Sequence, residues 1–184
     1  MTTRRTRREN GGKMIVSISL PEGTEWVSRV RDAAEHDMKN YQSCTQCILA
    51  AFMKELEIGN PLVLRAAGAM HGGMVCSLTC GIHSAGLMVL GLLMGRENLE
   101  TGFDGLFPIV VPAQELVSRL NKRIGSHSCL ELTGVDFTDL DKAMEFIVSE
   151  EHQKCISRVA EGAEEIGLFL KELEERGELF HYVG

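Results

Sequence analysis

The chain has 184 residues, of which 44% are hydrophobic and 24% charged, a composition typical of a globular domain with a core of its own. Its formal net charge of −7 is unevenly spread, because residues 1–13 contain five basic residues and one acidic residue. The acidic remainder argues against nucleic-acid binding as the main role. No apolar run follows the basic start, and the longest apolar stretch, residues 85–95, is too short to span a membrane. We therefore expect a cytoplasmic protein.

The first half of the chain predicts a flexible N-terminal arm followed by three helices. Residues 1–20 are basic and then alternate between apolar and polar, as in an extended segment, and Pro21 ends them. Apolar residues at helical spacing predict helices over residues 22–41, 44–58 and 61–70. Ser43 is placed to cap the second helix, and a glycine-rich turn after residue 70 ends the third.

Residues 80–95 are apolar on nearly every side, which predicts a buried helix. Each glycine in it lowers helix propensity by about 1 kcal/mol relative to alanine, so Gly81, Gly86, Gly91 and Gly95 predict close approach of another backbone or a prosthetic group. Further helices are expected over residues 107–124, 139–150 and 152–176. The sequence thus predicts an all-α fold: a single domain, residues 21–184, of six to seven helices around a central apolar helix that contains glycines.

Six cysteines are the residues most indicative of function. In the cytoplasm thiols usually stay reduced, so cysteines there more often bind metal or take part in catalysis than form structural disulfides. Two pairs have helical spacing and would share a helix face, and the two later cysteines each follow a nearby histidine. The six are Cys44, Cys47, Cys76, Cys80, Cys129 and Cys155, and the two histidines are His127 and His152.

The spacing alone leaves several functions open. Cys44 and Cys47 form a C-x-x-C pair that could exchange disulfides, and Cys76 with Cys80 could be a second exchanging pair. The same two pairs could instead hold zinc, with His127 or His152 as further ligands. Burial in the core without redox chemistry is the third interpretation. No C-x-x-C-H motif occurs, which argues against covalently attached haem.

Most of the chain, from about residue 27 to residue 170, resembles the C-GCAxxG-C-C family of redox-active proteins. The resemblance rests on Tyr41-Gln42-Ser43-Cys44, Ala66-Ala67-Gly68, Gly72-Gly73, Thr79-Cys80-Gly81, Leu90-Gly91-Leu92-Leu93-Met94-Gly95-Arg96, Ser128-Cys129-Leu130-Glu131-Leu132 and Lys154-Cys155. The sequence departs from the family pattern at Ile82, where the family has alanine, and at Ala85, where the motif glycine falls. Cys47 and Cys76 are additional to the pattern.

The resemblance implies a helical domain with four functional cysteines, Cys44, Cys80, Cys129 and Cys155. A similar domain in split-Soret cytochromes is associated with an iron–sulfur cluster, and such clusters are held by thiolates. Gly72, Gly73 and Gly81 would let backbone N–H groups approach its sulfides, and His83 is either a core histidine or a cofactor contact.

The resemblance therefore implies an iron–sulfur cluster or another metal, with Cys47 and Cys76 as possible additional ligands. It predicts electron transfer or redox sensing with a redox protein partner. Thiol–disulfide exchange and a structural zinc or non-redox module are the alternatives. We also expect a homodimer, in which the apolar residues of segment 13–20 reach a neighbouring subunit.

Overall fold

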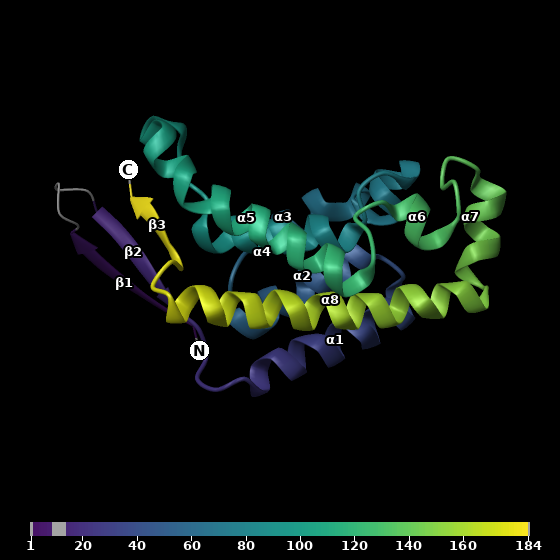
Figure 1. The fold of residues 1–184 in the computed structure, drawn as a ribbon, viewed down its shortest axis with the longest axis horizontal. Coiled ribbons are helices and arrows are strands. Elements are labelled where there is room, and N and C mark those ends of the chain that lie inside the picture. Colours follow the sequence, from purple (N-terminus) through teal and green to yellow (C-terminus); the bar gives the residue numbers. More distant parts are fainter. Residues whose placement is uncertain (1, 9–13, 184) are drawn as a thin grey trace.

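The computed structural model describes residues 2–8 and 14–183, and most of these residues lie in helices (Figure 1). The larger helices are α1 (Glu25–Tyr41), α2 (Cys44–Leu56), α4 (Gly81–Met94), α5 (Gly102–Ile124) and α8 (Glu150–Glu175). Shorter ones are α3 (Pro61–Ala66), α6 (Cys129–Thr133) and α7 (Leu140–Ile147). Single turns η1 (Ala67–Ala69), η2 (Gly73–Ser77) and η3 (Leu99–Thr101) join some of them.

A small antiparallel sheet corrects the expectation of an all-α fold. It has the order β1 (Thr3–Arg8), β2 (Met14–Ser19) and β3 (Phe180–Val183), so the two ends of the chain pair with each other. Val16 lies opposite His181, and Arg4 opposite Ile18. Strand β1 is exposed throughout and carries four arginines, which suits an edge strand because charged side chains discourage further strand pairing.

The predicted arm, residues 1–20, includes residues 1 and 9–13, which lie outside the described part of the chain. In the remainder, Ile15, Ile18 and Leu20 are buried within this same chain. The reasoning that these side chains lack a place in the fold, and so must reach a neighbouring subunit, was therefore wrong. The homodimer itself stays a prediction.

The core is formed by α1, α2, α4, α5 and α8, whose apolar faces meet in one cluster that includes Trp26, Phe52 and Phe169. Helix α8 runs the length of the molecule, from the sheet at one end to α7 at the other (Figure 1). Helix α5 begins at Gly102, five residues earlier than expected, because Pro108 and Pro112 lie inside the helix rather than at its start.

Helix α4 is buried on most of its surface, as expected, but not at Gly91. A side-chain carbon added at Gly91 would meet nothing within 4 Å, so the expected close approach there was wrong. The close approaches to other helices occur at Gly81 and Gly86. At Gly86 an added carbon would lie 3.1 Å from Leu116 and 3.2 Å from Ile166, which places α4 tightly against α5 and α8.

Candidate functional site

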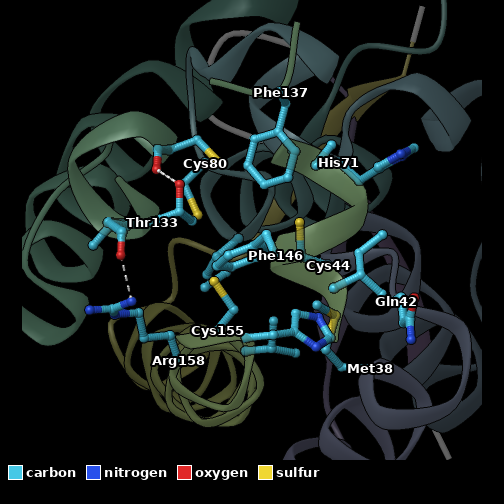
Figure 2. A pocket seen from close by; sticks show the side chains of 18 of the residues that line it. Met38, Gln42, Cys44, His71, Cys80, Thr133, Phe137, Phe146, Cys155 and Arg158 are labelled. Carbon is cyan, nitrogen blue, oxygen red and sulfur yellow. Dashed lines mark hydrogen bonds between the residues drawn. The ribbon is translucent and has the colours of Figure 1, made fainter. Parts of the chain in front are cut away.

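Four of the six cysteines line one cavity (Figure 2). Other lining residues come from α7 and the start of α8, which lie at the end of the molecule away from the sheet (Figure 1). The cavity has a volume of about 380 Å³. Its thiols come from Cys44 in α2, Cys80 directly before α4, Cys129 in α6 and Cys155 in α8. Figure 2 shows the sulfur atoms of Cys44, Cys80 and Cys155 around a common space, with Phe137 and Phe146 beside it. The fold thus unites residues that are far apart in the sequence.

Cys80 and Cys129 are held side by side by backbone pairing. Thr79 and Ser128 form an isolated antiparallel bridge. The Cys80 N–H donates to the His127 carbonyl at 2.7 Å, and the Cys129 N–H donates to the Leu78 carbonyl at 2.7 Å. Because these bonds involve the cysteines' own backbone groups, they fix the backbone positions from which both side chains extend.

A left-handed turn covers this pair. Gly72, Gly73, Met74 and Val75 all have φ between 56° and 61°. Such a backbone is unfavourable for non-glycine residues and for β-branched valine above all. Glycine is needed at Gly73, where an added side-chain carbon would lie 2.7 Å from Cys129 Cβ. The turn pairs with the segment before α7 through Ser77, whose hydroxyl donates to the Val135 carbonyl at 2.9 Å.

Cys44 is held where the N-termini of α2 and α4 meet. Gly81 makes this possible, because a side-chain carbon there would come closer than 3.0 Å to both Cys44 Sγ and Thr45 Oγ1. Backbone N–H groups of Gly72, Thr45 and Gly81 hydrogen-bond to the Cys44 sulfur. These bonds and the positive ends of two helix dipoles favour a thiolate at Cys44.

Burial acts in the opposite direction and raises the pKa of all four thiols. Desolvation is the main cause at Cys44 and Cys80, and it raises the pKa of Cys129 to about 12 and of Cys155 to about 11. The four cysteines also raise one another's pKa values, because two thiolates at close range repel each other. Burial therefore favours four neutral thiols in the metal-free protein, and a bound cation would be needed to hold them as thiolates.

Arg158 is a site residue that the sequence analysis missed. It lies one helical turn after Cys155, and its guanidinium hydrogen-bonds to that thiol, which lowers the pKa of Cys155 against the effect of burial. Arg158 Nη1 also donates to the Leu132 carbonyl at 2.9 Å, which fixes the guanidinium (Figure 2). The signal in the sequence was the i, i+3 spacing of a cation and a cysteine on one helix.

Most of the remaining candidate residues lie elsewhere. Cys47 is buried in the core on α2, and Cys76 is exposed on the left-handed turn, so neither lines the cavity with the other four cysteines. His83 is buried, and its Nε2 lies 3.1 Å from Asn121 Oδ1 instead of in the cavity. His127 contacts the His83 ring, whereas His152 does line the cavity, beside Phe146.

The two metal interpretations can be compared with this geometry. Zinc is held by ligand atoms about 2.0–2.3 Å away, which requires the ligands to converge on one point. Within residues 2–8 and 14–183, no group of three His, Cys, Asp or Glu side chains is arranged to hold a single metal ion. The four thiols instead line a larger cavity whose walls are mostly apolar. Their number and chemistry match the four thiolates that hold an iron–sulfur cluster.

In the described part of the chain, no helix is both long enough and apolar enough to cross a membrane.

Among known proteins, no curated protein and no solved structure matches this chain. A family model does match residues 42–167, which include all six cysteines; its description is "Putative redox-active protein (C_GCAxxG_C_C)". This match covers more than half of the chain, so the chain belongs to the C_GCAxxG_C_C family of putative redox-active proteins.

Proposed function

We propose that Cys44, Cys80, Cys129 and Cys155 bind an iron–sulfur cluster, and that the protein acts in electron transfer or redox sensing. The observation that carries this proposal is the meeting of four thiols from four separate elements on one cavity. When bound, a cluster would supply one-electron redox chemistry, at a potential set by hydrogen bonds to sulfur and by solvent exposure. The redox role itself is that of the family.

The protein's own residues suit this role in three ways. The N–H groups of Gly72, Thr45 and Gly81 stabilise negative charge at the Cys44 sulfur, and Arg158 does so at Cys155. Phe137 and Phe146 line the cavity and exclude water from it.

Thiol–disulfide exchange is the second candidate, favoured by the closeness of the same four free thiols. It is less well supported, because exchange needs a thiolate, and burial raises the pKa of the thiols. The C-x-x-C motif does not help, since Cys47 lies in the core with its pKa raised to about 11 by burial. A structural zinc site remains the third candidate. Cytoplasmic location, a redox protein partner and a homodimer stay proposals.

The test is cysteine-to-serine substitution with anaerobic purification and measurement of iron and acid-labile sulfide. Cys80→Ser and Cys155→Ser are each expected to lose most of the iron and sulfide, because each removes one of four ligands to a shared centre. Cys76→Ser is the matched control, since Cys76 is exposed and outside the cavity, and should retain both. Equal iron and sulfide in all three variants would reject a shared site. Circular dichroism checks that each variant is folded.

A further inference from the structure

The cavity opens on a surface that is apolar where proteins are usually polar. Tyr41, Val75 and Leu140 both line the cavity and are exposed, so they form its mouth. Met144 and then Val148, the residue directly after α7, continue the exposed face of this helix beyond Leu140, four residues apart. We call these five residues the α7 rim. Leu140, Met144 and Val148 are 73%, 65% and 85% exposed, respectively.

Helix α7 is therefore apolar on two sides. Ala143, Phe146 and Ile147 line the cavity, Met144 is exposed outside it, and Leu140 lies at the edge between the two sides. A helix that only closed the cavity would need the first side alone. Exposed apolar residues that follow one face of a helix and are flanked by charged residues mark an interaction site.

The charge around the α7 rim indicates what covers it. Residues 131–151 contain seven carboxylates and a single cation, Lys142, although the whole chain has a net charge of only −7. Lys142 is itself paired with Asp139, at 2.9 Å. Asp141, Glu145 and Glu150 are exposed beside the rim. A partner that covers this face must therefore bring positive charge, because a second acidic surface would be repelled.

We propose that the α7 rim is the docking surface for a soluble redox protein whose contact face has an apolar centre ringed by lysines or arginines. This inference rests on the proposed function, since three residues of the α7 rim line the same cavity as the four thiols. It adds to that function the site of contact and the chemistry of the partner. The apolar rim supplies burial, and the acidic surround orients the partner and speeds its approach.

The test is an NMR titration of the ¹⁵N-labelled, anaerobically purified protein at low salt, with a lysine-rich cytochrome c as the basic probe and an acidic flavodoxin as its counterpart. The expected result is saturable binding of the cytochrome alone, weakened by added salt, with the largest shifts at the α7 rim. The double variant Asp141→Lys/Glu145→Lys should weaken this binding by about tenfold or more. Glu175→Lys, an exposed acid at the far end of α8, controls for charge reversal and should change it little.

A second pair of variants tests the apolar part of the α7 rim. Met144→Gln should weaken cytochrome binding, whereas Phe107→Gln, at an exposed phenylalanine of α5, should not. The inference would be overturned if the cytochrome bound the double variant Asp141→Lys/Glu145→Lys as tightly as it binds Glu175→Lys. It would also be overturned if the flavodoxin bound the wild-type protein as tightly as the cytochrome does. Concentration-dependent broadening of rim signals without any probe would also overturn it, because a second copy of the chain would then occupy the surface.

Failure of this inference differs from failure of the proposed function. A protein that holds iron at its four cysteines but shows no shifts at the α7 rim overturns the docking surface alone. A protein that binds the cytochrome at the rim but holds no iron retains the surface and loses the cluster.

Discussion

Gly81 offers the sharpest test of how the site is built. Replacing it with alanine adds one carbon atom at the junction of α2 and α4. That carbon would come closer than 3.0 Å to Cys44 Sγ and Thr45 Oγ1, and would lie 3.2 Å from the Thr45 backbone nitrogen. Carbon atoms pack best at about 3.5–4.0 Å, so the overlap is substantial.

The overlap can be relieved in two ways. In the first, the Cys44 and Thr45 side chains rotate away, which removes a thiol from the cavity. In the second, the added carbon forces the two helices apart, and overpacking of this kind costs about 1–3 kcal/mol of stability. The Thr45 nitrogen belongs to the backbone and cannot rotate away. We therefore expect Gly81→Ala to bind less iron than the wild type, to have a lower free energy of unfolding, or both. Metal analysis and urea denaturation measure the two quantities.

Gly91→Ala is the matched control, because Gly91 lies in the same helix and its added carbon meets nothing within 4 Å. Alanine is the better helix former, so Gly91→Ala should raise the free energy of unfolding by about 0.5–1 kcal/mol. Iron content should be unchanged in this variant. If Gly81→Ala were as stable as Gly91→Ala and held as much iron, the close contact between α2 and α4 would not be what places Cys44.

Three further predictions follow from the thiols and their surroundings. In the metal-free protein the raised pKa values of Cys129 (about 12) and Cys155 (about 11) mean that the folded state holds these protons more tightly than the unfolded chain. The protonated thiols therefore contribute fully to the free energy of unfolding below about pH 9, and this contribution is lost as the pH rises through 11 to 12. Urea denaturation should show a smaller loss of this free energy over that pH range for Cys155→Ser than for the wild type. Arg158→Gln removes a cation and a hydrogen bond from Cys155, and should lower the midpoint potential of the iron-loaded protein by about 60 mV, the equivalent of a tenfold change for one electron. Lys154→Gln, which removes an exposed cation, is the control in the same potentiometric titration, and equal shifts in both variants would contradict a specific role for Arg158. With iodoacetamide at pH 7, mass spectrometry of the metal-free protein should find Cys76 alkylated first, because it is the exposed thiol; earlier labelling of Cys129 would contradict the burial described here.

The helices could be predicted from the sequence because their signals are local. Helical spacing of apolar residues placed α1, α2, α4 and α8 to within a few residues of their ends. The sheet could not be predicted in this way, because β2 is completed by β3 from the other end of the chain. Residues 14–19 alternate as a strand should, but their neighbour in sequence, β1, contains only threonine and arginine and shows no apolar alternation.

The site was predictable in part, and for a different reason. The choice of Cys44, Cys80, Cys129 and Cys155 came from the family resemblance, since their spacing follows no local ligand motif. Which glycine allows a close approach depends on tertiary packing, so Gly81 and Gly91 looked alike in the sequence. Capping shows the same limit: the Ser43 hydroxyl, which the sequence places at the start of α2, makes no capping bond.

The most direct test of the central claim is the content of the wild-type protein after anaerobic reconstitution with iron and sulfide. Iron and acid-labile sulfide should be bound in equal, whole-number amounts per chain, with a visible absorption band that bleaches on reduction by dithionite. Binding of zinc alone, or a colourless protein that reversibly forms disulfides among the four cavity cysteines, would contradict the account.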